Sequence, residues 1–159
     1  MDIYIRPLKE EDALISYKWR NDPDIWQFTE KKPDKYITPE IELNWIRQVL
    51  QKNNEKRFAI CIKETNEYIG NTQLTSITND SAEFHIFIGE KKYWGMGIAK
   101  KALQLIIQYA FEELKLKYIY LKVNKNNIRA IKVYIDSGFY IVSEDNTNLI
   151  MELKNLFLT

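Results

Sequence analysis

The sequence predicts an α/β fold, of the α+β kind, with a mixed and mostly antiparallel sheet of about seven strands flanked by four helices. Three apolar segments, residues 57–63, 68–75 and 82–88, follow one another with only turn residues between them, which favours antiparallel pairing. A long helical pattern separates the third segment from the next apolar run, 118–123, which favours a parallel pair with a right-handed crossover. We expect residues 1–159 to form a single domain.

Two helices follow a short alternating strand at residues 2–6. The first is predicted over residues 10–20, and residues 21–23 end it, because a residue that precedes proline avoids the helical conformation. The second begins after Thr38, which is placed to cap it, with Pro39 at the first helical position. The apolar positions expected in these helices are Ala13, Leu14, Tyr17, Trp19, Ile41, Trp45, Ile46, Val49 and Leu50.

The segment between these helices, residues 25–36, has no clear period and is interrupted by Pro33. It carries Trp26, Phe28 and Tyr36. Aromatic side chains in an irregular segment are typical of a substrate pocket, but they equally fit a segment that closes over the core. The sequence leaves both interpretations open.

The second half of the chain alternates helices and strands. Apolar residues at three- or four-residue spacing predict a long core-packed helix, and a shorter helix ends near Gly138, which is placed for a left-handed cap. In chain order, a long helix, a strand, a short helix and two closing strands are predicted at residues 96–114, 118–123, 128–136, 139–142 and 149–153.

Composition limits the function classes. The formal net charge of the 159 residues is +1, so no strong electrostatic field favours nucleic acid or a membrane as partner. No apolar run approaches the length of a membrane span. The single cysteine, Cys61, lies in an apolar run and cannot form an internal disulfide, so we expect a buried thiol and a cytoplasmic protein.

The segment Lys92-Tyr93-Trp94-Gly95-Met96-Gly97-Ile98-Ala99-Lys100 is the first candidate site. It joins a predicted strand to the start of the long helix. The first N–H groups of a helix have no partner within the helix, and the helix dipole adds partial positive charge there. Glycine allows close approach to the backbone and positive φ angles. The segment therefore predicts an anion site suited to a phosphate, although a plain strand-to-helix turn has the same pattern.

The second candidate site is the short helix that follows Asn127. Asn127 and Tyr134 are two turns apart on one helical face, roughly 10 Å along the axis. A tyrosine hydroxyl in that position can donate a proton to a ligand. Taken alone, the helix equally fits an asparagine cap and a tyrosine packed in the core.

Together these two motifs resemble the GNAT superfamily of acyl-CoA-dependent N-acetyltransferases. The family's [QR]-x-x-G-x-[GA] loop is similar to residues 92–97, with Lys92 in place of glutamine or arginine. Its N-x-x-A-x-x-x-Y-x-x-x-G-F pattern matches residues 127–139 in full. The opening residues 5–8 and 19–23 also look like members of the family, and the order of elements agrees along nearly the whole chain.

The resemblance implies acetyl-CoA as co-substrate and no metal ion. The pantetheine arm would lie in a splayed parallel strand pair, residues 84–88 and 119–123, held by the backbone of Phe87 and Ile88. Tyr134 would protonate the leaving thiolate. The other residues implied for the co-substrate are Lys92 and Gly95, the amides of Met96, Gly97, Ile98, Ala99 and Lys100, and Asn127, while Lys91 and Lys101 add positive charge nearby.

Glu83 and His85 are the candidates for the general base that takes the proton of the attacking amine. Strand alternation places both side chains on one face, with Phe87. His85 is the only histidine and titrates near neutrality. Both residues also fit purely structural roles, as a strand-edge carboxylate and a satisfied core histidine.

The acceptor is expected to be a small-molecule amine such as a nucleotide-linked amino sugar. The alternatives are a polyamine, the N-terminus of a ribosomal protein, and a non-catalytic CoA-binding domain. A polyamine site needs clustered carboxylates, which Glu30, Asp34, Glu40 and Glu42 would supply in part. The paired closing strands offer a sheet edge to a second copy, so a homodimer is expected.

Overall fold

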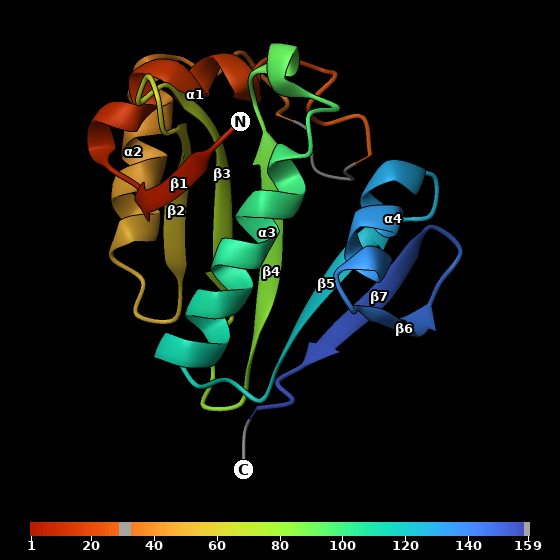
Figure 1. The fold of residues 1–159 in the computed structure, drawn as a ribbon. Helices are drawn as coiled ribbons and strands as arrows, with labels where there is room; N and C mark the ends of the chain where they lie inside the picture. Colours follow the sequence, from red (N-terminus) through yellow and green to blue (C-terminus); the bar gives the residue numbers. More distant parts are fainter. Residues whose placement is uncertain (29–32, 158–159) are drawn as a thin grey trace.

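The computed structural model of the chain describes residues 1–28 and 33–157. One mixed sheet runs through it in the order β1-β2-β3-β4-β5-β7-β6 (Figure 1). All neighbouring strands are antiparallel except β4 and β5. This confirms the predicted fold class. The strands are β1 Ile3–Pro7, β2 Lys56–Ile62, β3 Tyr68–Thr75, β4 Ser81–Ile88, β5 Tyr118–Asn124, β6 Tyr140–Glu144 and β7 Asn148–Lys154.

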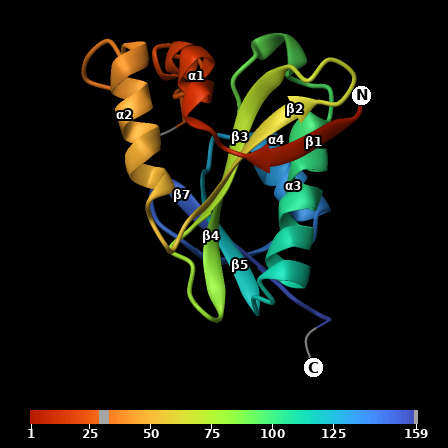
Figure 2. The ribbon, with the colours of Figure 1, turned by 90° about the vertical axis from the view of Figure 1, so that its left-hand side faces the viewer.

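Four α-helices cover the two faces of the sheet. Helices α1 and α2 lie on one face and α3 on the other, which leaves β1 to β4 between them (Figure 2). Helix α4 lies beside β5 and β7 (Figure 1). The helices are α1 Ala13–Arg20, α2 Pro39–Leu50, α3 Ile98–Gln108 and α4 Ile128–Asp136.

Two predicted helices differ from the observed ones at their ends. The long helix starts at Ile98, because Gly97 has a φ angle of +76° that a right-handed helix excludes, and its last turn, Tyr109–Glu113, is π-helical. The helix predicted over residues 10–20 opens with a 3-10 turn, Glu10–Asp12, in which Asp12 accepts hydrogen bonds from the Arg6 side chain. The second helix starts as predicted, since the Thr38 side chain accepts from the Ile41 amide.

The buried face of α1 omits one of the predicted apolar positions and includes a polar residue instead. Leu14 is 65% exposed, whereas Ser16 is buried. The Ser16 hydroxyl donates a 2.8 Å hydrogen bond to the buried carboxylate of Glu42 on α2. Because a buried polar group needs a partner, this bond explains how a serine occupies the interface between the two helices.

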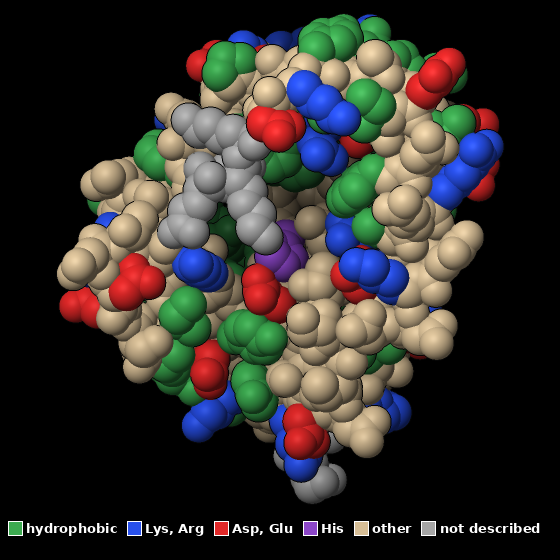
Figure 3. Space-filling view, turned by 180° about the vertical axis from the view of Figure 1, so that it is seen from behind, with side chains coloured by type: hydrophobic (Ala, Val, Ile, Leu, Met, Phe, Trp, Pro, Cys, Tyr) green, Lys and Arg blue, Asp and Glu red, His purple; other side chains and the backbone are tan. Residues whose placement is uncertain are grey.

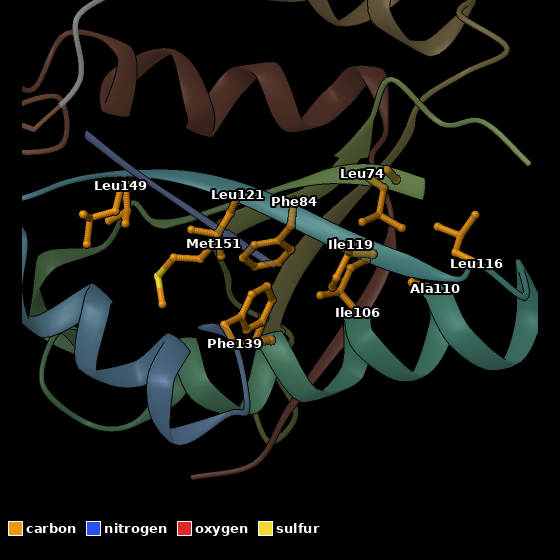
Figure 4. Close-up of a cluster of buried hydrophobic side chains, with 13 residues drawn as sticks. Leu74, Phe84, Ile106, Ala110, Leu116, Ile119, Leu121, Phe139, Leu149 and Met151 are labelled. Carbon is orange, nitrogen blue, oxygen red and sulfur yellow. The ribbon is translucent and has the colours of Figure 1, made fainter. Parts of the chain in front are cut away.

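The main core lies between the sheet and helices α3 and α4. Phe84 of β4 and Phe139 approach one another among leucine, isoleucine and methionine side chains, and Ile106 contributes from α3 (Figure 4). Burying a side chain of this size stabilises the fold by about 1.5–3 kcal/mol. Cys61 is fully buried in a second cluster, as predicted. This core fixes the positions of β4, α3 and α4, which surround the candidate site.

Strands β4 and β5 separate soon after they begin. Their parallel pairing runs only from Ser81 opposite Tyr118 to Glu83 opposite Tyr120. Beyond Glu83 the two strands diverge, and the start of α3 lies near the wide end of the gap (Figure 1). The remaining part of β4, from Phe84 to Ile88, is therefore paired on one side only, with β3.

Candidate active site

The glycine turn ends directly at the start of α3. Gly95 and Gly97 have φ angles of +78° and +76°, a region that other residues rarely adopt. A Cβ added to Gly97 would meet no atom within 4 Å, so this glycine is required by its backbone angle and faces open space. The first hydrogen bond within the helix runs from the Lys101 amide to the Gly97 carbonyl. The amides of Ile98, Ala99 and Lys100 precede that bond and can bind an anion.

A groove of about 750 Å³ begins at this turn and lies between the end of β4 and helix α4. Its volume lies within the usual range for sites that hold a small molecule or cofactor. The groove brings together residues that lie far apart in the sequence. Those named in the sequence analysis are Phe28, Phe87, Ile88, Gly95, Gly97, Ile98, Ala99, Lys100, Asn127 and Tyr134. Met96 is instead 46% exposed and is not part of the groove lining.

Tyr134 reaches the groove from α4. Its ring packs at 6.1 Å from the ring of Phe84 and at 5.7 Å from that of Phe139, which fixes its orientation. Burial raises the pKa of the Tyr134 hydroxyl to about 12. The phenol therefore keeps its proton at neutral pH and can serve as a donor toward the groove. The structure combines the two interpretations of this residue, because Tyr134 packs in the core and also lines the groove.

Asn127 similarly combines a structural and a ligand-facing position. Its side-chain oxygen accepts a 3.3 Å hydrogen bond from the Ala130 amide and so caps α4. The same residue lines the groove. Since the cap uses the oxygen, the side-chain NH₂ group is the part of Asn127 suited to contact a ligand.

Three of the four lysines near the turn have partners elsewhere. Lys92 lies 3.3 Å from the carboxylate of Glu67, and this contact raises the pKa of its ammonium group. Lys91 pairs with Asp22 and Asp24, and Lys101 donates to the Met1 carbonyl. Lys100 lines the groove. The structure thus brings Lys100 to the predicted anion site and places Lys92 outside it.

Trp94 lines the groove, and although it lies in the predicted segment, the sequence interpretation gave it no role. The Phe87 carbonyl approaches Gly70 on β3 so closely that a Cβ there would clash with it. Because backbone groups of successive strand residues point to opposite neighbours, the Ile88 carbonyl faces the gap to β5. The Trp94 indole N–H donates a 2.8 Å hydrogen bond to this carbonyl. A tryptophan next to a glycine turn was the available signal, but nothing in the sequence pairs it with Ile88.

A second concave region lies on the opposite side of the molecule. Figure 3 shows the chain's only histidine at the floor of a hollow in this face, with acidic and basic side chains around it. His85 Nε2 lies 3.1 Å from the carboxylate of Glu83 and 3.1 Å from the hydroxyl of Thr75. The two predicted base candidates, Glu83 and His85, therefore lie in contact on the side of the sheet that carries α1 and α2.

Strand register defines the floor of this rear hollow. Gln73 lies opposite both Arg57 and His85, and Glu83 lies opposite Thr75 on one side and Tyr120 on the other. Directly opposite residues share one face of the sheet. The floor therefore presents a belt of polar side chains across four strands: Arg57, Gln73, Thr75, His85, Glu83 and Tyr120.

Aromatic side chains of the α1–α2 layer border the same face. The guanidinium groups of Arg20 and Arg57 lie 5.1 Å and 5.0 Å from the ring of Trp45. Arg20 also lies 5.7 Å from the ring of Trp26, which packs against Phe87. Of the three aromatic residues predicted between the helices, Trp26 thus lies at the rear, Phe28 lines the groove, and Tyr36 is 66% exposed.

A comparison with protein families now identifies the chain. A family described as "Acetyltransferase (GNAT) domain" matches residues 2–140. The chain belongs to this family of acetyltransferases. The resemblance carried by the glycine turn and the Asn127–Phe139 pattern is therefore confirmed.

Individual relatives agree with this assignment. The chain is 33% identical over 138 residues to the acetyltransferase PseH of Campylobacter jejuni, covering 87% of this chain and 83% of that protein. It is 31% identical over 144 residues to the uncharacterized N-acetyltransferase p20 of Bacillus licheniformis, covering 85% and 77%. Each relative is covered over most of its length, so the similarity is not restricted to one motif.

Solved structures agree as well. PseH of C. jejuni in complex with acetyl coenzyme A is similar to the chain with a TM-score of 0.75 and 28% identity, over 96% and 99% of the two chains. Spermidine N-acetyltransferase of Vibrio cholerae, in complex with CoA and spermine, has a TM-score of 0.85 at 23% identity, over 96% and 95%. The second likeness supports the fold alone.

The protein is thus an N-acetyltransferase that uses acetyl-CoA as co-substrate. The residues present fit that molecule, since the groove combines free helix-start amides, a glycine with open space in front of it, and a strand edge paired on one side only. None of the helices in residues 1–28 and 33–157 is both long and apolar enough to cross a bilayer.

Proposed function

We propose that the enzyme acetylates a primary amine of a small molecule, such as a nucleotide-linked amino sugar, with the amine bound in the rear hollow. The observation that carries the proposal is that β4 contributes residues both to the groove and to the rear hollow. Its Phe87 and Ile88 line the groove, while its Glu83 and His85 lie at the rear. A thioester in the groove and an amine in the hollow would meet where β4 and β5 diverge.

The co-substrate would lie along the groove from the glycine turn to Tyr134. Its diphosphate would accept hydrogen bonds from the amides of residues 96–100, next to the Lys100 side chain. The turn at Gly95 and Gly97 leaves room for that approach. The amide-containing arm would pair with the open edge of β4 through the backbone of Ile88, because the Phe87 carbonyl faces β3 and not the gap. Asn127 would lie on the other wall of the groove.

The chemistry of the transfer then follows from the groups on the two sides. The neutral amine attacks the thioester carbon, a C–N bond forms, and the C–S bond breaks. The amine proton passes to the Glu83–His85 pair, and the Tyr134 hydroxyl protonates the departing thiolate, whose pKa would be about 8.5 by analogy with cysteine. A backbone amide of β4 beside the thioester oxygen would stabilise the negative charge that develops there.

The polar belt favours a hydroxyl-rich acceptor over a polyamine. Gln73, Thr75 and Tyr120 offer neutral donors and acceptors suited to sugar hydroxyls. A polyamine would need several accessible carboxylates. Glu42 does not supply one, since it is buried against Ser16 and Arg20. Of the other predicted carboxylates, Asp34 and Glu40 are exposed, and Glu30 lies outside the described residues.

A panel of amines tests the proposal. Release of CoA from acetyl-CoA is measured with amino sugars, their nucleotide-linked forms, polyamines, and peptides with an N-terminal alanine. We expect the highest kcat/KM with an amino sugar. Turnover with spermidine or peptides, and none with any amino sugar, would show that the proposed acceptor class is wrong. Calorimetry with acetyl-CoA runs in parallel, and tight binding without any turnover would favour a non-catalytic CoA-binding domain.

We also propose that the enzyme is a cytoplasmic homodimer. The cytoplasmic setting rests on the single cysteine, which cannot form an internal disulfide. The dimer rests on edge strand β6, where Tyr140, Ile141 and Val142 are 41%, 51% and 43% exposed. Light scattering of the wild type and of Ile141→Lys tests this, and a wild-type mass equal to one chain would reject the dimer.

A further inference from the structure

His85 has two partners on one ring nitrogen. The Nε2 atom lies 3.1 Å from Glu83 Oε2 and 3.1 Å from Thr75 Oγ1. The two partners are held in place by register, because Thr75 and Glu83 lie opposite one another on β3 and β4. The imidazole side chain is still 41% exposed, and it lies at the floor of the rear hollow (Figure 3). One ring nitrogen is thus engaged within the protein while part of the ring faces the hollow.

These contacts decide which nitrogen carries the proton. A carboxylate can only accept hydrogen bonds, and an unprotonated imidazole nitrogen can also only accept. The 3.1 Å approach of Nε2 to Glu83 is therefore favourable when Nε2 is protonated and donates. The lone pair of the neutral ring then lies on Nδ1.

We infer that His85 is the general base, acting through Nδ1, and that Glu83 and Thr75 are positioning residues that hold its Nε2–H tautomer. The inference rests on the proposed function and divides the Glu83–His85 pair into two roles. In the reaction, a proton leaves the attacking amine and bonds to Nδ1 as the C–N bond forms. Glu83 accepts the hydrogen bond from Nε2–H throughout and stabilises the imidazolium that results.

Charged groups on three elements act on this ring. Glu83 lies on the same strand, Arg57 lies on β2 two strands away, and Glu55 precedes β2 and pairs with Arg57. Burial lowers the pKa of His85 below its usual value of 6.5, Glu83 and Glu55 oppose that shift, and Arg57 adds to it. His85 is accordingly neutral at pH 7, in the form that can accept a proton. Tyr120, opposite Glu83 on β5, is a further ionisable group beside the pair.

The single histidine allows a direct measurement. Tag-free protein labelled with ¹⁵N-histidine gives one imidazole pattern in a long-range ¹H–¹⁵N spectrum, and that pattern distinguishes the Nε2–H from the Nδ1–H tautomer. We expect Nε2–H at pH 8. An Nδ1–H tautomer would overturn the inference. This spectrum needs no substrate, so it can fail while the proposed function stands, and the amine panel can fail while the tautomer is as inferred.

Kinetics separate the base from the residue that orients it. His85→Gln should lower kcat/KM by about 10²- to 10⁴-fold, the range typical of a lost general base. Glu83→Gln keeps a carbonyl oxygen that can accept from Nε2–H, so kcat/KM should fall only about tenfold. Because the negative charge of Glu83 raises the pKa of His85, its loss should move the acid limb of the pH profile to lower pH. If Glu83→Gln costs as much as His85→Gln, Glu83 is itself the base and the inference is wrong.

Two further variants exclude a merely structural explanation. Glu55→Gln removes a charge that acts on His85 without contact, so it should move the acid limb in the same direction and leave turnover at high pH unchanged. Thr75→Val should keep the Nε2–H pattern and lower kcat/KM by less than Glu83→Gln. Loss of the Nε2–H pattern in Glu55→Gln, or a greater loss of kcat/KM in Thr75→Val than in Glu83→Gln, would contradict the inference.

Discussion

The groove and the rear hollow of this enzyme are built from different kinds of groups. The groove depends mainly on the backbone: amides at the start of α3, two glycines with positive φ, and the open edge of β4. The hollow depends on side chains from several strands and two helices, brought together by sheet register. A backbone site tolerates most sequence changes but needs particular conformations, whereas a side-chain site changes its ligand with a few substitutions. This contrast fits the proposed arrangement, with the co-substrate in the groove and the acceptor amine in the hollow.

The largest expected effect comes from the side chain that we propose as the acid in the groove. Tyr134→Phe removes the hydroxyl and keeps the ring contacts with Phe84 and Phe139. We expect kcat to fall by about 10²-fold or more, since a positioned acid is lost. The affinity for acetyl-CoA, measured by calorimetry, should remain within about twofold. Unchanged turnover would show that Tyr134 is not the acid.

A backbone change should impair binding more than chemistry. Gly97→Ala strains a φ angle of +76° and adds a methyl group to open space in the groove. We expect acetyl-CoA to bind about tenfold more weakly, which corresponds to about 1.4 kcal/mol. The matched control is Gly138→Ala, where φ is +101° at the end of α4. The control should lose thermal stability and keep its acetyl-CoA affinity, and equal losses of affinity would count against the anion site at α3.

Trp94→Phe should change binding in the opposite direction. The substitution removes the indole N–H and leaves the Ile88 carbonyl free for the arm of the co-substrate. A hydrogen bond contributes about 0.5–1.5 kcal/mol net, so the affinity for acetyl-CoA should rise by about 2- to 10-fold. Calorimetry checks this. Weaker binding in the variant would mean that the indole itself contacts the co-substrate.

The smallest effect is expected from Lys92, which the family resemblance assigned to the co-substrate. Lys92→Ala should leave acetyl-CoA affinity within about twofold, because Lys92 pairs with Glu67 outside the groove. Lys100→Ala, at the groove, should weaken binding by about three- to fivefold at low salt. A larger loss in Lys92→Ala than in Lys100→Ala would contradict the geometry of the turn.

The difference between the two sites also explains what the sequence could predict. Gly95, Gly97, Asn127 and Tyr134 stand at fixed spacings on local elements, so their arrangement follows from turn and helix geometry. The pairing of Glu83 with His85 follows in the same way from strand alternation.

Other features depend on contacts between distant segments. Nothing local indicates that Lys92 meets Glu67, that Trp94 donates to Ile88, or that Ser16 is buried against Glu42. Thr75 joins His85 only because β3 and β4 pair in one particular register. These are tertiary outcomes, and the sequence pattern contains no signal for them.

The most direct test of the account is a crystal structure of the enzyme with acetyl-CoA. We predict that the diphosphate accepts hydrogen bonds from the amides of Ile98, Ala99 and Lys100, and that the thioester sulfur lies within hydrogen-bond reach of the Tyr134 hydroxyl. The acetyl group would then point through the gap between β4 and β5 toward His85. A complex in which the thioester lies away from Tyr134, or the diphosphate away from the start of α3, would contradict the account.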